Sequence, residues 1–199
     1  MGLELDYIEG QTPIDEDEKE GLLVKTISTR GELDEFEQIN IQQAIEWSMK
    51  TKFDRKQFLT EDFLLLIHKK MFGEVWEWAG TKRETNKNIG VDKTQISIEL
   101  RKLIDDCNFW LENNSFDQDE IAIRFSHRLV KIHLFPNGNG RHSRFVADIM
   151  ISKIFGRTVF SWGGSDLSGA NTLRKEYLEA IRKADGDNYK PLIDFARKQ

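Results

Sequence analysis

The sequence lacks several features that would assign the protein to a broad class. It holds one cysteine, Cys107, so it can form no intramolecular disulfide. No stretch approaches the roughly 18 apolar residues that a membrane-spanning helix needs. The N-terminus has neither a basic start nor an apolar run, which argues against a signal peptide. We therefore expect a cytoplasmic protein that does not associate with membranes.

The sequence also lacks an excess of positive charge. The 199 residues carry 29 Lys and Arg against 34 Asp and Glu, a formal net charge of -5. An acidic chain does not favour direct nucleic-acid binding, and no helix-turn-helix pattern stands out, so a DNA-binding regulator has little support. No pair among the four histidines has zinc-site spacing with a third ligand in reach, and His68, on an apolar helix, is expected to be structural.

Helical patterns dominate the chain, whose length suits one domain with a real core. Residues 1–30 form an acidic arm, and residues 31–199 are predicted to form the domain. The predicted helices begin at Glu32, after the N-cap Thr60, near Ser97, at Asp117 and near Gly140, and two more span about 170–185 and 188–198. Ile89 and Val91 around Gly90 predict a short β-hairpin. We expect an all-α fold with this one small hairpin.

The run HLFPNGNGRHSR, from His133 to Arg144, holds the residues best suited to chemistry. Gly138 and Gly140 permit a tight turn whose successive N–H groups attract anions. A helix that starts near Gly140 adds free donors and the positive end of its dipole. Arg141 and Arg144 would share one helix face, and guanidinium groups suit phosphate oxygens. His133 could take a proton from an attacking hydroxyl. Although each feature alone is typical of an ordinary turn and a solvated helix, their combination predicts phosphate chemistry.

This run resembles the signature of Fic-domain proteins, HxFx(D/E)GNGRxxR. The matching residues are His133, Phe135, Gly138, Asn139, Gly140, Arg141 and Arg144. Leu134 replaces a common proline, and Asn137 replaces the acidic residue that binds Mg²⁺ in the family. The resemblance covers roughly residues 35–198, including the segment MFGEVWEWAGTKR from Met71. The opening of the chain resembles a subgroup often called mobile mystery protein B.

The resemblance implies a helical Fic fold and transfer of AMP from ATP to a Ser, Thr or Tyr hydroxyl of a protein, which could be the chain itself. It also implies Mg²⁺ as cofactor. His133 would act as general base, and Asn137 would be a weak Mg²⁺ ligand because an amide oxygen brings no charge. The phosphates would contact Gly138, Asn139, Gly140, Arg141 and Arg144. Ile89, Gly90 and Val91 would belong to a flap that docks the target.

The family also suggests regulation. Many members are inhibited by a glutamate in the pattern (S/T)xxxE(G/N), which pairs with the second motif arginine, here Arg144. No segment matches this pattern fully. Glu37 is the favoured candidate because it lies on a predicted helix beside the core, and Glu9 is the second. Family members often form dimers that bury the inhibitory region, so a homodimer is one option.

Two other functions stay open. The Doc branch of the family transfers phosphate instead of AMP, and it loses the second glycine of the turn. Gly140 is present here, which favours AMP transfer. Asn137 leaves room for a nucleotide-binding module without efficient chemistry. The intact His133 and both arginines argue against that loss.

Overall fold

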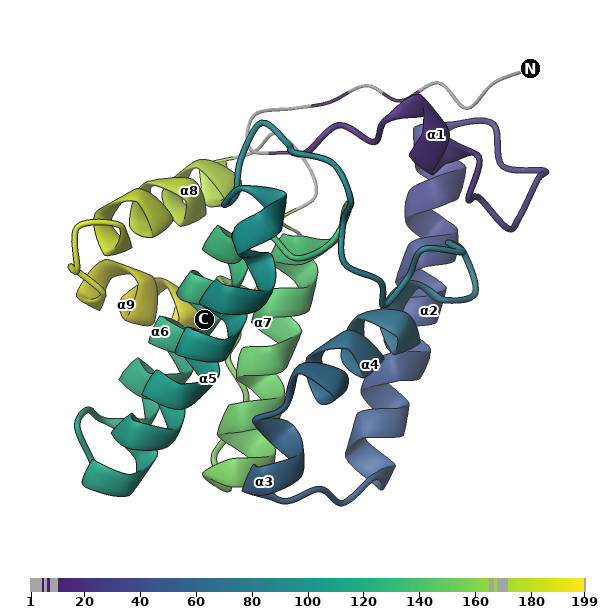
Figure 1. The fold of residues 1–199 in the computed structure, drawn as a ribbon. Helices are drawn as coiled ribbons and strands as arrows, with labels where there is room; N and C mark the ends of the chain where they lie inside the picture. Colours follow the sequence, from purple (N-terminus) through teal and green to yellow (C-terminus); the bar gives the residue numbers. More distant parts are fainter. Residues whose placement is uncertain (1–4, 6, 8–10, 165–166, 168–171, 199) are drawn as a thin grey trace.

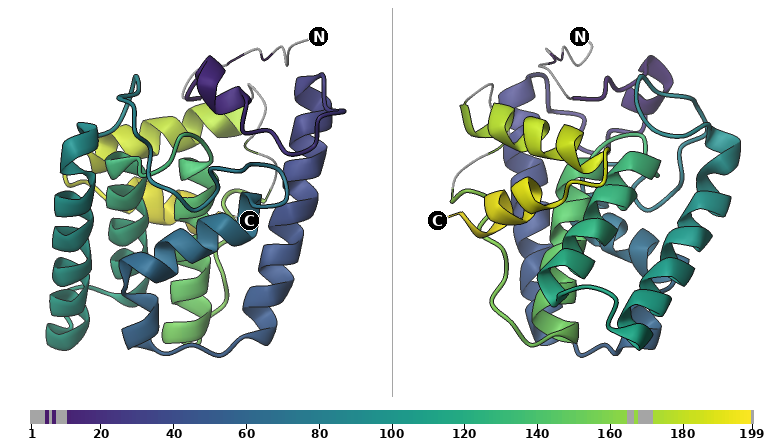
Figure 2. Two further views of the ribbon diagram at one scale, coloured as in Figure 1. Left: turned by 45° about the vertical axis from the view of Figure 1, so that its right-hand side comes forward. Right: turned by 90° about the vertical axis from the view of Figure 1, so that its left-hand side faces the viewer.

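The computed structural model describes residues 5, 7, 11–164, 167 and 172–198. These residues form a helical domain, which confirms the predicted all-α class (Figures 1 and 2). Its α-helices are α1 (Glu16–Lys19), α2 (Arg30–Lys50), α3 (Arg55–Phe58), α4 (Glu61–Phe72), α5 (Ile96–Asn113), α6 (Gln118–Ile132), α7 (Asn139–Ile149), α8 (Thr172–Ala184) and α9 (Lys190–Arg197). A 3₁₀ turn, η1 (Lys93–Gln95), precedes α5, and a π-helical segment, η2 (Met150–Ile154), continues α7.

Helix α7 lies at the centre of the domain (Figure 1). It packs against α6 on one side, with α5 beyond, and against α4 on the other, with α2 beyond. Helices α8 and α9 pack together next to α6. Large aromatic side chains such as Phe58, Trp76 and Phe125 are fully buried between these layers. Burial of such apolar area is the main force that holds the layers together.

The helix starts that matter for the site follow from short polar side chains. Thr60 accepts a hydrogen bond from the Phe63 N–H at 3.2 Å, so it caps α4 as predicted. Thr29 caps α2 by accepting from the Glu32 N–H, and the Glu32 carboxylate accepts in return from the Thr29 N–H at 3.0 Å. These caps set where α2 and α4 begin, and both helices face the start of α7.

Residues 81–92 form bends and irregular backbone in place of the expected hairpin. Among the described residues the structure has one isolated β-bridge, between Leu22 and Trp76. The reason is that the polar groups of this loop pair elsewhere. The Arg83 guanidinium donates hydrogen bonds to the carbonyls of Thr85 and Val91, and the Val91 N–H donates to the Ile132 carbonyl at 3.4 Å. These main-chain groups are therefore not free to pair across a hairpin.

Residues 11–30, from the acidic arm, pack against the helices. Ile14, Leu22 and Ile27 are buried, while most of the acidic stretch around α1 is exposed. The Leu23 N–H donates to the Val75 carbonyl at 2.9 Å, which fixes the arm beside the end of α4. In the views the arm crosses above the loop between α6 and α7 (Figures 1 and 2). Within the described part of the chain, no helix combines the length and apolar character needed to cross a membrane.

Candidate active site

The motif forms the loop that joins α6 to α7, and its two ends have left-handed backbone. His133 caps the C-terminus of α6 with a φ of 60°, and Gly138 precedes α7 with a φ of 77°. Positive φ is uncommon for a residue with a side chain, so neighbouring contacts must hold His133 in this conformation. The turn at His133 ends α6 and directs the imidazole towards the arm, where its Nε2 contacts Thr12.

Asn139 and His68 hold the loop. The Asn139 side chain accepts from the Phe135 N–H at 3.0 Å and donates to the Phe135 carbonyl at 2.8 Å. The Phe135 ring stacks on the His68 ring with centroids 3.6 Å apart. His68 Nδ1 accepts from the Gly80 N–H at 3.0 Å, so its Nε2 carries the proton and donates to the Asn137 carbonyl at 3.1 Å. Burial lowers the pKa of His68 well below its usual value, in keeping with a neutral ring.

The two glycines of the turn are present for different reasons. A Cβ at Gly138 would lie 2.7 Å from the Phe72 ring, so the fold itself excludes a side chain there. A Cβ at Gly140 would meet nothing nearer than Arg144 Nη1 at 3.6 Å, and Gly140 has ordinary helical backbone. The space beside Gly140 is therefore not needed for packing. It lies at the N-terminus of α7, where free N–H groups favour an anion.

Arg83 links the loop of residues 81–92, called the flap from here on, to the motif, and no pattern in the sequence distinguishes this arginine. Its Nε donates to the His133 carbonyl at 2.6 Å, and its other nitrogens donate to the Thr85 and Val91 carbonyls. Gly90 packs against His133 so closely that a Cβ would lie 2.6 Å from the His133 Cβ. Of the three predicted flap residues, Ile89 is exposed, Gly90 contacts the motif, and Val91 is partly buried.

His133 is buried, with 3% of its surface exposed. Its Nε2 lies 3.0 Å from Thr12 Oγ1, and its Nδ1 has no hydrogen-bond partner among the described residues. Burial, with the nearby charge of Arg83, lowers the pKa of His133 to about 4. The ring is therefore neutral at pH 7, the form that a general base needs before it accepts a proton.

Both polar atoms of the Asn137 side-chain amide form hydrogen bonds. Its nitrogen donates to the Thr12 carbonyl at 2.8 Å, and its oxygen accepts from the Gly138 N–H at 2.7 Å. No cluster of three or more His, Cys, Asp or Glu in the described chain could hold a metal ion. Because Mg²⁺ prefers carboxylate oxygens, the neutral amide of Asn137 does not fit a resident magnesium ion.

Glu37 contacts the motif, but not through the expected arginine. Its carboxylate is 3% exposed; one oxygen accepts from Trp76 Nε1 at 2.7 Å and the other pairs with Arg141 Nη1 at 2.5 Å. The expected partner, Arg144, lies one turn further along α7 and places its guanidinium 5.3 Å from the Tyr177 ring centre. The two arginines therefore point to different neighbours, and only Arg141 faces α2. Glu9, the second candidate, lies outside the described residues.

The loop thus brings together a buried histidine, a glycine turn at a helix N-terminus and two arginines of α7. Residues 58–151 match the model of the family described as "Fic/DOC family". The matched stretch contains the motif, so it is similar to the family that the motif predicted. The finer resemblance to mobile mystery protein B stays a prediction.

The chain is also similar to proteins of known name. The chain is 22% identical over 171 residues to "Protein adenylyltransferase Fic" of Nematostella vectensis, a match that covers 83% of the chain and 38% of that relative. The BepC protein of Bartonella tribocorum, solved with bound AMPPNP, superposes with a TM-score of 0.66 at 20% identity and covers 92% of this chain and 97% of that one. Fic-1 of C. elegans gives 0.61 at 20% identity, with 80% and 46% covered. At these identities the solved structures establish the fold alone.

The contrast between the two glycines gives a prediction. Gly138→Ala should lower the free energy of unfolding by about 2 kcal/mol or more, because it combines a positive φ with a clash against Phe72. Gly140→Ala should fold at least as well as the wild type, because alanine favours a helix. It should nevertheless bind ATP more weakly, since the added methyl group fills the space beside the free N–H groups. Urea denaturation and titration calorimetry measure the two effects. If Gly140→Ala binds ATP with wild-type affinity, the phosphates of ATP do not bind beside Gly140.

Proposed function

We propose that the chain is a protein adenylyltransferase, which moves AMP from ATP to a hydroxyl group of a protein. The observation that carries this proposal is the position of the buried His133. Its Nε2 can contact a hydroxyl, as it does that of Thr12 at 3.0 Å, and its loop leads directly into the N-terminus of α7. The name of the Nematostella vectensis relative and the AMPPNP bound to BepC support an ATP-dependent transfer at this site.

In the proposed reaction His133 Nε2 takes the proton of the target hydroxyl. The hydroxyl oxygen attacks the α-phosphorus of ATP, the bond from that phosphorus to the bridging oxygen breaks, and pyrophosphate leaves. The N–H groups of the first turn of α7, with Arg141 and Arg144, would neutralise the phosphate charge. Such transfers depend on positioning and charge neutralisation more than on covalent protein chemistry.

Magnesium enters this proposal as part of the substrate, the complex of Mg²⁺ with ATP. Asn137 would then contribute a neutral amide oxygen, whose second lone pair is not used by the hydrogen bond from the Gly138 N–H. A neutral ligand holds Mg²⁺ less tightly than a carboxylate. Higher Mg²⁺ concentrations should therefore be needed than in a relative with an acidic residue at this position.

We further propose that Glu37 restrains the enzyme by occupying Arg141. The Arg141 side chain is 30% exposed, and its guanidinium is shared between Glu37 and the Phe72 ring, whose centre is 4.8 Å away. A phosphate that reaches Arg141 has to displace a buried carboxylate from it. The hydrogen bond from Trp76 keeps that carboxylate in place, so the restraint is built into the packing of α2.

The main alternative is transfer of the γ-phosphate, as in the Doc branch. Gly140 favours AMP transfer over this alternative. An experiment with ATP labelled at the α or the γ phosphate distinguishes the two reactions. A nucleotide-binding module without chemistry would bind ATP and transfer neither group.

The reaction can be tested with ATP labelled at the α or the γ phosphate, in the presence of Mg²⁺ and cell lysate. We expect protein-bound label from the α position only, and its loss in His133→Ala, because that variant lacks the base. Label from the γ position alone would mean a phosphotransferase. Binding of ATP without transfer of either label would mean a module without chemistry.

Glu37→Gln tests the restraint. Glutamine keeps an oxygen for Trp76 but lacks the charge that holds Arg141, so we expect ATP affinity to rise roughly tenfold, the equivalent of about 1.4 kcal/mol. AMP transfer should rise with it. The matched control is Glu35→Gln, which removes the same charge from an exposed position on α2. If Glu37→Gln only lowers the melting temperature and leaves ATP affinity unchanged, Glu37 is a structural residue.

Asn137→Asp tests whether the side chain at this position contacts the Mg²⁺ of the Mg²⁺–ATP complex. A carboxylate would supply the charge that the amide lacks, so half-maximal AMP transfer should require a several-fold lower Mg²⁺ concentration. Titration of Mg²⁺ at fixed ATP measures this change. An unaltered Mg²⁺ dependence would show that this side chain does not approach the metal–nucleotide complex.

A further inference from the structure

Thr12, in the N-terminal arm, contacts the residue expected to act as base. Its Oγ1 lies 3.0 Å from His133 Nε2, although the two residues are 121 positions apart in the sequence. Both side chains are buried, and Thr12 is 6% exposed. This is the distance at which a general base and the hydroxyl that it deprotonates have to lie. Thr12 therefore occupies the position expected for the acceptor hydroxyl.

The backbone of the arm is held in register at the same point. The Asn137 side chain donates to the Thr12 carbonyl at 2.8 Å, so one motif residue binds the main chain while another contacts the side chain. Pro13 follows Thr12, and a residue before proline is restricted to extended backbone. An extended segment presents its side chain away from its own main chain. Thr12 thus reaches His133 from a backbone that the motif itself binds.

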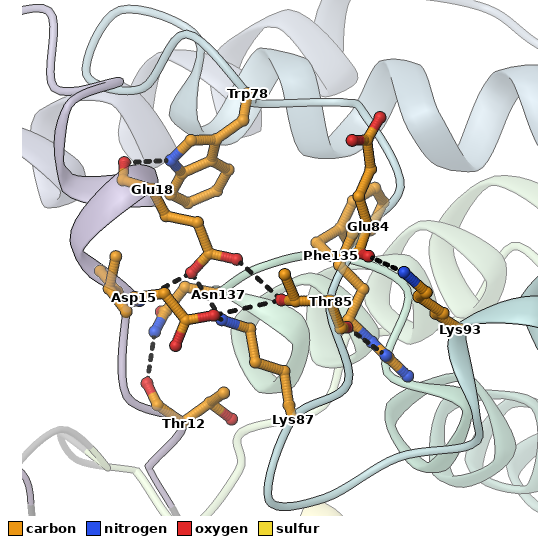
Figure 3. A network of polar contacts seen from close by, with 12 residues as sticks. Thr12, Asp15, Glu18, Trp78, Glu84, Thr85, Lys87, Lys93, Phe135 and Asn137 are labelled. Carbon is orange, nitrogen blue, oxygen red and sulfur yellow. Dashed lines mark hydrogen bonds and ion pairs between the residues drawn. The ribbon is translucent and has the colours of Figure 1, made fainter.

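The flap clamps the segment that follows. Lys87 has only 3% of its side chain exposed and pairs with Asp15 at 2.7 Å and Glu18 at 2.6 Å (Figure 3). Trp78 Nε1 adds a hydrogen bond to the Glu18 carbonyl at 3.0 Å. Lys87 also holds the pKa of Asp15 below its usual value. A cation buried between two carboxylates makes this a specific docking contact between the arm and the flap.

We propose that Thr12 is an acceptor for AMP within its own chain, an inference that rests on the proposed function. The Thr12 Oγ1–H proton passes to His133 Nε2, and Oγ1 forms a bond to the α-phosphorus of ATP. The bond between that phosphorus and the oxygen of the leaving pyrophosphate breaks. The product has no hydroxyl hydrogen at residue 12, so each chain can accept one AMP there. Because the acceptor is already in place, the rate is independent of protein concentration.

The full chain incubated with ATP and Mg²⁺ tests this by intact mass and peptide mapping. We expect the mass gain of one AMP per chain, located at residue 12, with a first-order rate that does not change over a hundredfold range of protein concentration. Thr12→Val should lose this label, and Thr12→Ser should retain it because serine keeps the hydroxyl. Thr26→Val, at an exposed position of the arm, should label like the wild type.

Asp15→Asn combined with Glu18→Gln tests the clamp. Both changes remove a charge that holds Lys87, so labelling of residue 12 should slow several-fold while its location stays the same. This variant alters the arm and leaves the motif and the flap intact.

Other outcomes separate the two proposals. Label on lysate proteins, or on another residue of the chain, with residue 12 unmodified in the wild type would overturn the assignment of Thr12 and leave the adenylyltransferase proposal standing. In that case the clamp variant should transfer AMP to lysate proteins faster, because the arm would only cover His133. A rate proportional to protein concentration would also overturn transfer within one chain. No AMP transfer to any protein by the wild type or by Glu37→Gln would overturn both proposals.

Discussion

The buried guanidinium of Arg83 joins three stretches of main chain that would otherwise be independent. It donates to carbonyls at the two ends of the flap, Thr85 and Val91, and to the carbonyl of His133. A guanidinium has only donors, so in a buried position it needs acceptors, and burial already lowers its pKa. The carbonyl of His133 can serve because α6 ends there. One side chain therefore links the position of the flap to the conformation of the residue expected to act as base.

Much of the fold could be predicted because it depends on local patterns. Apolar spacing and the Thr60 cap placed the helices, and the motif placed the turn before α7. The flap could not be predicted in the same way. Ile89 and Val91 around Gly90 are typical of a hairpin, yet the donors of Arg83 take the carbonyls at its ends. That competition depends on a contact with His133, 50 residues away, which no local pattern shows.

The same distinction between local patterns and distant contacts applies to the site. The residue types needed for phosphate chemistry could be read from twelve consecutive positions. Their partners could not, because they come from distant segments: Glu37 from α2, and Thr12 from the arm. Glu37 could be suspected from its place on a predicted helix, but its choice of Arg141 over Arg144 depends on how α2 crosses α7. Pro13 predicts extended backbone at Thr12, but nothing in the sequence predicts that this threonine contacts His133.

Glu37 and Thr12 act on opposite ends of the motif, and this separation bears on the order of events. Both precede residue 58, where the match to the family begins, so the segment before the family domain supplies both contacts. Glu37 binds the arginine that a nucleotide would need, whereas Thr12 binds the histidine that a hydroxyl would need. A nucleotide that displaces Glu37 need not displace Thr12. Under the proposed function, ATP can therefore enter while Thr12 stays on His133, and that state is the one from which transfer within the chain would occur.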